Sequence, residues 1–394
     1  MQKFTSRFTI LFLTFSLGTA IASVWFFQTK AEQNNILPTP ITSDENSKPS
    51  QKTLEMVFVL DTTGSMGGLI DGAKQKIWSI VNDVMQRQDH PKVKVGLVAY
   101  RDNGDAYVTQ VLALTEDLDK VYSTLMDYRA EGGGDTPENV RRGLAEGVEK
   151  SGWSRVNPNT AQIIFLVGDA PPHDDYVQEP DVLVTTAKAV RQNMIVNTIQ
   201  CGGAADTRQI WQQIARRGEG KYFAIAQDGG VQAITTPFDS KLGELANQLG
   251  GTYTAYGKAE DRKVNAARQV ETETKIYAGA SNTAQADRAM NKAINKDAYS
   301  GDLLQSIENE SVKLDTIKDE DLPDDLRKLS PAARQKEVEK RLAERKQIRE
   351  EILNLSKQRD AFIQEAKKKT GKEDGFDAAV SSALSEQMTR KGIK

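Results

Sequence analysis

The sequence predicts an α/β fold: a doubly wound, mostly parallel six-stranded sheet, preceded by an N-terminal hydrophobic helix and followed by an α-helical C-terminal region. Between residues 54 and 249, apolar runs alternate with longer amphipathic stretches, the pattern of alternating strands and helices. The connections between them are short, which favours right-handed crossovers between parallel strands. After Gly251 apolar residues become sparse and charged, helix-forming residues dominate. The length of 394 residues accommodates two or three domains with a sizeable core.

Six strands and six helices are expected in the sheet region. The strands are predicted at Glu55–Leu60, Val93–Tyr100, Tyr107–Leu114, Ala161–Val167, Ile195–Ile199 and Tyr222–Ile225. The helices are predicted at Leu69–Gln88, Leu118–Tyr128, Pro137–Lys150, Asp181–Gln192, Thr207–Arg217 and Ser240–Gln248. The connection from Arg101 to Ala106 is too short for a crossover helix, so the second and third strands should form an antiparallel hairpin.

The N-terminus has the pattern of an export or anchoring signal. Lys3 and Arg7 precede a nearly uncharged run, Phe8–Phe27, which as a helix of about 20 residues spans about 30 Å. Residues 1–27 are therefore predicted to be a signal peptide or a transmembrane anchor: a small-residue cleavage pattern at residues 20–22 fits the first, and the length favours the second. The basic residues predict a cytoplasmic N-terminus. The domains should then be extracytoplasmic, in the periplasm or at the cell surface, or secreted if the leader is cleaved.

Residues 28–53 are polar and contain Pro38, Pro40 and Pro49. They lack the apolar residues of a core, so they are predicted to be a flexible linker.

Composition removes several classes of function. The 52 basic and 55 acidic residues give a net charge of −3 and are interleaved, so no basic stripe for nucleic acid is present. One cysteine and two histidines exclude internal disulfides, thiolate clusters and multi-histidine sites. The residues around Lys74 do not make a phosphate-binding loop, because Ala73 separates Gly72 from Lys74 and no Ser or Thr follows Lys74. Neither histidine has a recognisable nucleophile context, so an enzyme is not expected. Any chemistry of this protein must therefore use oxygen ligands and carboxylates.

The first predicted strand ends in a loop of oxygen donors, Asp61-Thr62-Thr63-Gly64-Ser65, directly before a helix. Donors at alternate positions of a tight loop can converge on a hard cation such as Mg²⁺, which prefers oxygen ligands in an octahedron. The same residues also fit an ordinary helix start, with Ser65 as the capping hydroxyl and Thr63 in the turn. These residues alone leave both interpretations open.

Two further loops are expected at the same edge of the sheet. A glycine-rich segment, residues 131–138, places Thr136 before a helix predicted to begin at Pro137, where Thr136 also fits an N-cap. The fourth predicted strand is followed by Asp169. Because ligand sites of open α/β sheets form at the carboxyl ends of strands, these residues are expected near Asp61.

Taken together, these motifs resemble the von Willebrand factor A domain family over residues 54–250. The resemblance implies a metal-ion-dependent adhesion site made by Asp61, Thr63, Ser65, Thr136 and Asp169. Thr63 replaces the usual first serine of the family but keeps a hydroxyl. The expected cofactor is Mg²⁺, or another divalent cation such as Mn²⁺ or Ca²⁺. The expected partner is a protein that offers a Glu or Asp carboxylate to the cation, so binding is favoured over turnover.

Charged residues near these loops have less specific interpretations. Arg101, Asp102 and Asp105 end a predicted strand and either shape the partner surface or serve as polar turn residues. The same segment contains Asp135 and Glu138, which either tune the field at the cation or complement a helix dipole. After Asp169 comes His173, which either reaches the rim of the site or is a loop residue held by the two prolines before it.

The C-terminal third divides into a helical connecting region, residues 251–330, and a charged helical region, residues 331–394. A heptad seam runs through Ile348, Ile352, Leu355, Phe362 and Ala366, interrupted by Arg359. The pattern fits a coiled coil, which would make the protein a homo-oligomer, and equally an amphipathic helix packed on its neighbours.

The leading hypothesis is therefore a membrane-tethered or exported protein that binds a protein partner through a cation. One alternative is a scaffold assembled through the C-terminal helices. A less favoured one is a metal-dependent hydrolase, for which no general base is evident.

Overall fold

The computed structural model describes residues 51–231, 233–370 and 375–394. The predicted leader, residues 1–27, and nearly all of the predicted linker lie outside the described residues. Within those three ranges, no helix combines the length and the apolar character that crossing a bilayer requires.

A six-stranded sheet forms the core of the first half of the chain. Its strands are β1 (Thr53–Asp61), β2 (Lys92–Tyr100), β3 (Thr109–Thr115), β4 (Thr160–Gly168), β5 (Met194–Cys201) and β6 (Glu219–Ile225). The order is β3-β2-β1-β4-β5-β6, with only the β2–β3 pair antiparallel. The predicted mostly parallel sheet with one hairpin is confirmed. The strand order reverses between β1 and β4, so the carboxyl ends of these two neighbours face one crevice.

Both faces of the sheet are covered by helices, which explains the continuous apolar runs of the central strands. Along β1, Leu54, Met56, Phe58 and Leu60 pack on one side and Val57 and Val59 on the other. The helices of the first side are α1 (Gly67–Met85), α2 (Leu118–Asp127) and α12 (Phe376–Arg390), and those of the second are α3 (Val140–Glu149), α4 (Val182–Arg191) and α5 (Ala205–Arg217).

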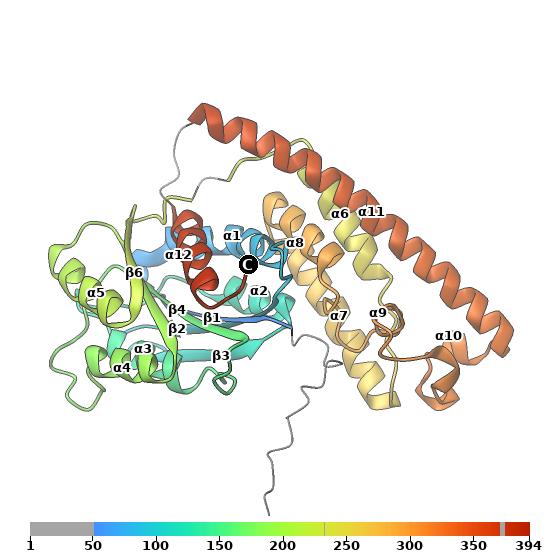
Figure 1. The fold of residues 1–394 in the computed structure, drawn as a ribbon, viewed down its shortest axis with the longest axis horizontal. Helices are drawn as coiled ribbons and strands as arrows, with labels where there is room; N and C mark the ends of the chain where they lie inside the picture. The colour runs from blue at the N-terminus through green and yellow to red at the C-terminus, as the bar shows by residue number, and fades with distance from the viewer. Residues whose placement is uncertain (1–50, 232, 371–374) are drawn as a thin grey trace, which may run out of the picture. The chain divides into compact units, whose positions relative to one another are not determined.

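The helix α12 comes from the C-terminus of the chain yet completes the core of the sheet. Phe376, Val380, Leu384 and Met388 are buried in the same cluster as Phe58 and Trp78. Figure 1 shows α12 beside α1, reached only after the chain has passed through the helical region. The amphipathic pattern of residues 376–390 therefore serves the sheet, although nearly the whole helical region separates it from β6 in sequence.

The helical region follows β6. Its helices are α6 (Asp239–Gly251), α7 (Ala259–Gly279), α8 (Asn282–Ile294), α9 (Leu303–Glu308), α10 (Asp324–Arg327) and α11 (Pro331–Thr370), with short 3₁₀ turns at Leu314–Thr316 and Asp319–Asp321. A buried charge cluster fixes this region to α2. Arg288 donates to Asp119 at 2.7 and 2.8 Å and to Glu273, and Lys292 pairs with Asp119 at 2.7 Å. Burial opposes ionisation of Asp119, but Arg288 and Lys292 hold its pKa well below the usual range.

The long helix α11 lies across α6 and α8 (Figure 1). One buried residue recurs every seven positions along it, in the order Val338, Arg345, Ile352 and Arg359. Each arginine is neutralised: Arg345 pairs with buried Asp302, and Arg359 pairs at 2.6 Å with Asp239 of α6 and at 2.6 Å with Asp287 of α8. Ile348, Ile352 and Leu355 of the predicted seam therefore pack within the chain, and Arg359 lies on the same face, whereas Phe362 is 42% exposed.

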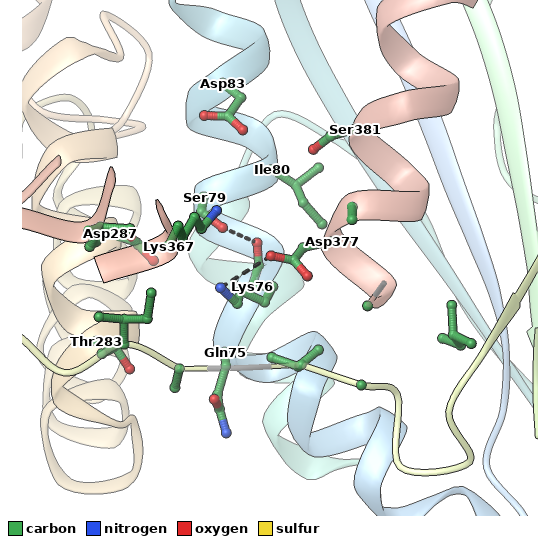
Figure 2. A pocket seen from close by; sticks show the side chains of 18 of the residues that line it. Gln75, Lys76, Ser79, Ile80, Asp83, Thr283, Asp287, Lys367, Asp377 and Ser381 are labelled. Carbon is green, nitrogen blue, oxygen red and sulfur yellow. Dashed lines mark hydrogen bonds and ion pairs between the residues drawn. The ribbon is translucent and has the colours of Figure 1, made fainter. Parts of the chain in front are cut away.

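A hollow of about 830 Å³ opens where α1 meets α8 and the ends of α11 and α12. Figure 2 shows Lys76 of α1 facing Asp377 of α12, an ion pair at 3.2 Å, with Asp83 and Lys367 nearby. Its wall carries both acidic groups, such as Asp83 and Asp287, and basic groups, such as Arg359.

Candidate metal site

Asp61 ends β1 at the crevice and is fully buried. Its Oδ1 atom accepts hydrogen bonds from the backbone N–H of Thr63 at 2.9 Å and from the Thr63 hydroxyl at 2.7 Å. Its Oδ2 atom is buried and finds no hydrogen-bond partner among the described residues. Burying a carboxylate oxygen without a hydrogen-bond partner costs free energy, so we expect a cation or a proton at this atom.

Thr63 and Ser65 follow in the predicted loop but differ in exposure. Thr63 is buried, whereas Ser65 is exposed in a 3₁₀ turn, Gly64–Met66, that leads into α1. Ser65 borders a hollow of about 410 Å³, together with Gly68, Gln227 and Asp228. Backbone hydrogen bonds from Gly64 to Gly132 and from Glu131 to Thr62 hold this loop against the glycine-rich segment.

Asp169 follows β4, the neighbour of β1, and is half-buried. Its Oδ2 atom accepts a hydrogen bond from the Gln227 side chain at 2.6 Å. Gly168 allows the close approach of the two strand ends, since a Cβ there would lie 3.1 Å from Asp61 Oδ2 and would clash with the Tyr100 hydroxyl. The two aspartates predicted at neighbouring strand ends therefore lie in the same crevice.

In the glycine-rich segment, the structure brings Glu138 rather than Thr136 to the buried part of the site. Thr136 is exposed, and α3 begins at Val140 with Asn139 as its N-cap, three residues after the predicted start at Pro137. Glu138 is 4% exposed, and its Oε2 atom has no hydrogen-bond partner among the described residues. A Cβ added to Gly133 would lie 2.9 Å from Glu138 Oε1 and 3.2 Å from Thr63 Cβ, which locates this carboxylate beside the Asp61 loop.

A backbone bridge explains why Glu138 turns inward. Its N–H donates to Pro171 at 3.0 Å, and its carbonyl accepts from the N–H of His173 at 3.2 Å, so residue 138 pairs with Pro172 as a short parallel bridge. Because of this pairing, α3 begins only at Val140, and the glycine-rich segment is hydrogen-bonded to the loop that follows β4. From the sequence, the acidic residue two positions after Thr136 was visible, but nothing distinguished it from an ordinary helix-dipole partner.

The electrostatics of the crevice favour a positive ion. Burial raises the pKa of Asp61 to about 7, with a further contribution from the charge of Asp169. Burial also raises the pKa of Glu138 to about 9, and the charges of Asp61 and Asp102 add to that shift. Two buried carboxylates with unpaired oxygens fit a divalent cation, because its charge would offset the repulsion that makes their ionisation costly.

A family model described as von Willebrand factor A domain matches residues 55–237. Residues 55–237 are a von Willebrand factor A domain. The match spans the sheet from β1 to the loop after β6, so it contains the crevice and each loop described above.

Curated relatives share the A domain but are much longer proteins. The von Willebrand factor A domain-containing protein 7 of Rattus norvegicus is 30% identical over 195 residues, which is 49% of this chain and 20% of the rat protein. The protein of the same name from Homo sapiens is 30% identical over 202 residues, 50% of this chain and 20% of the human protein. This chain therefore aligns with about a fifth of the length of these relatives.

A solved A domain, that of SpRpn10, is also similar to this chain. It matches with 18% identity and a TM-score of 0.34, and the match covers 45% of this chain and 89% of that domain.

The A domain indicates a protein-interaction or scaffold role in general terms, and A domains commonly bind a divalent cation. The edge of the sheet that holds Asp61, Asp169 and Glu138 is the candidate place for such a role, because ligand sites of open α/β sheets form at the carboxyl ends of strands and two buried carboxylate oxygens there lack hydrogen-bond partners among the described residues.

Proposed function

We propose that the A domain binds a protein partner through a divalent cation at a metal-ion-dependent adhesion site. The cation is Mg²⁺, with Mn²⁺ or Ca²⁺ as alternatives, and its ligands come from Asp61, Thr63, Ser65, Thr136 and Asp169, with Glu138 as a further carboxylate beside them. The observation that carries the proposal is the pair of buried carboxylate oxygens, Asp61 Oδ2 and Glu138 Oε2, that lack hydrogen-bond partners among the described residues. A cation of hard, oxygen-preferring character satisfies both.

Each residue has a distinct part in this proposal. The Thr63 hydroxyl and N–H hold Asp61 Oδ1, which leaves Oδ2 to face the cation. Ser65 is exposed and supplies a neutral hydroxyl at the mouth of the crevice. The Gln227 side chain donates a hydrogen bond to Asp169 at 2.6 Å, so the position of the Asp169 carboxylate depends on the loop that follows β6. The bound cation supplies an electrophilic centre for an anionic group of the partner.

The partner group that fits best is a Glu or Asp carboxylate beside basic residues. A divalent cation attracts an oxygen anion, but Glu138 adds a third carboxylate to Asp61 and Asp169, and Asp102 and Asp105 lie at the neighbouring end of β2. This negative rim repels an isolated acidic segment beyond the first coordination shell. Lysine or arginine residues next to the coordinating carboxylate would offset that repulsion. Thr136, like Ser65, is exposed and supplies a hydroxyl at the mouth of the crevice.

We propose binding rather than turnover. The donors around Asp61 are hydroxyls and carboxylates, which hold a cation but do not form a catalytic pair with an imidazole. The histidine of the loop after β4, His173, is held among Asp102, Asp135 and Asp175.

We also propose that the A domain acts outside the cytoplasm. The support is the pattern of residues 1–27, with basic residues before an apolar run of membrane-spanning length. Such a leader would hold the domain at the periplasmic or outer face of the cytoplasmic membrane, or release it if cleaved. Reporter fusions to residue 53, with an enzyme active only outside the cytoplasm, test this location.

The decisive experiment measures cation binding and partner binding in the same variants. Calorimetry should find one Mg²⁺ site that Asp61→Asn and Glu138→Gln abolish. Asp71→Asn is the matched control, because Asp71 is an exposed carboxylate on α1 whose side chain is 72% exposed. Peptides selected from a displayed library in Mg²⁺ should share a Glu or Asp and be released by EDTA. Retention in EDTA, or unchanged Mg²⁺ binding by Asp61→Asn, would disprove the mechanism.

A further inference from the structure

A second group of metal-ligating side chains lies at the same edge of the sheet, formed by Asp102, Asp135 and His173. Each offers one donor atom, and the three donor atoms lie within 4.8 Å of one another. Asp102 follows β2, Asp135 belongs to the glycine-rich segment and His173 to the loop after β4. The bridge between Glu138 and Pro172 holds the last two loops together, so three distant parts of the chain meet at one point.

The histidine provides the observation that points to a ligand. His173 is 8% exposed, and its Nε2 atom has no hydrogen-bond partner among the described residues. The other ring nitrogen, Nδ1, lies 2.9 Å from Asp175 Oδ1. A carboxylate at that distance accepts the Nδ1 proton and leaves the Nε2 lone pair free. This is how carboxylates orient metal-binding histidines in proteins.

The distances at Nε2 fit a shared cation better than direct contact. Nε2 lies 3.5 Å from Asp102 Oδ2 and 3.8 Å from Asp135 Oδ2, at or beyond the limit of a hydrogen bond. Two donors about 2.0–2.1 Å from a tetrahedral metal are separated by about 3.3 Å. Each carboxylate therefore needs to approach Nε2 by only about 0.2–0.5 Å, and Asp135, whose side chain is 60% exposed, has room to adjust its position.

The remaining carboxylate is also held in place. The Tyr176 hydroxyl donates to Asp102 at 2.8 and 2.9 Å, and the Tyr176 ring stacks on His173 with centroids 4.1 Å apart. The two least mobile donors, Asp102 and His173, are thus positioned by one tyrosine. Support of this kind around the ligands is typical of a preorganised metal site.

We propose that Asp102, Asp135 and His173 form a second cation site, which takes a first-row transition metal with Zn²⁺ as its best representative. One imidazole and two carboxylates suit Zn²⁺ and its neighbours more than Mg²⁺, which prefers oxygen ligands alone. The three donors leave at least one coordination position to water or to a group of the partner protein. None of them belongs to the Asp61 site, so the two cations bind separate ligands.

The test uses full-length chain with ¹⁵N-labelled histidine in the Asp61→Asn background, which removes the site of the proposed function. Because the chain has only two histidines, His90 serves as the internal reference. One equivalent of Zn²⁺ should shift the Nε2 resonance of His173 and leave His90 unchanged. Failure of the Asp61 site would not affect this result, so the two proposals fail separately.

Calorimetry with Zn²⁺ in the same background measures how much each residue contributes to the Zn²⁺ affinity. Asp102→Asn should weaken binding at least tenfold, and Asp175→Asn about 10- to 100-fold through loss of histidine orientation. Asp174→Asn is the matched control, since its side chain is 97% exposed and pairs only with Arg141 among the described residues. His173→Gln should abolish binding, with circular dichroism to verify folding. Unshifted His173 resonances, a doubly protonated ring at pH 7, or undiminished Zn²⁺ binding by Asp102→Asn and Asp175→Asn would overturn the proposal.

Discussion

Binding of Mg²⁺ at the Asp61 site should depend steeply on pH, because protons and the cation compete for the same oxygens. Burial raises the pKa of Asp61 from 3.8 to about 7 and that of Glu138 from 4.5 to about 9. Below pH 7 both carboxyls of the metal-free protein are therefore protonated. Mg²⁺ must displace those protons before it can bind.

The expected size follows from the two pKa values. Each proton released changes the apparent affinity tenfold per pH unit, or about 1.4 kcal/mol. Between pH 7 and pH 5, displacement of the Asp61 proton alone lowers the affinity about 50-fold, because Asp61 is already half protonated at pH 7, and displacement of the Glu138 proton lowers it further. Without metal, stability changes with pH in the opposite direction. Since the folded-state pKa of Asp61 is raised above its unfolded value, the free energy of unfolding falls by about 3 kcal/mol as pH rises from about 4 to 7.

Calorimetry between pH 5 and 8, in buffers of different ionisation enthalpy, measures both the affinity and the number of protons released. Thermal unfolding with and without Mg²⁺ should show a stabilisation that grows with pH. The Asp71→Asn control should keep the wild-type profile, because Asp71 is exposed and outside the crevice. An affinity that is constant between pH 5 and 7, or binding without proton release, would refute this account of the site.

Three further substitutions probe the supports of the site and of the fold. Gly133→Ala should lower stability by about 1–2 kcal/mol and weaken Mg²⁺ binding in calorimetry, because Gly133 has φ +74° and a Cβ there would press on Glu138. The control Gly134→Ala should change neither stability nor Mg²⁺ binding, because a Cβ at Gly134 meets no atom within 4 Å. Arg359→Met should cost about 3–5 kcal/mol in urea unfolding by leaving Asp239 and Asp287 buried without a counter-charge, and a loss no larger than that of exposed Lys346→Met would contradict the ion-pair argument. Phe376→Ala should cost about 3–5 kcal/mol in the same assay, with exposed Ser382→Ala as control, and a cost below about 1 kcal/mol would show that α12 is not part of the core of the sheet.

Local pattern was sufficient for the sheet and for the two aspartates at its edge. Strands buried on both faces are continuous apolar runs, so β1 and β4 could be located and their ends assigned to Asp61 and Asp169. The short connection after β2 predicted the hairpin, and the structure has it. These features depend on neighbouring residues, which is why one sequence sufficed to predict them.

Contacts between distant segments decided the rest. Glu138 turns inward because its backbone pairs with Pro172, and no pattern near residue 138 shows that pairing. His173 becomes a candidate ligand only because three loops meet. The C-terminal helices illustrate the same limit, since Arg359 breaks an apolar seam in sequence but meets Asp239 and Asp287 in space. A sequence reports what each residue prefers to have around it, whereas the partner of a buried charge depends on which segments the folded chain brings together.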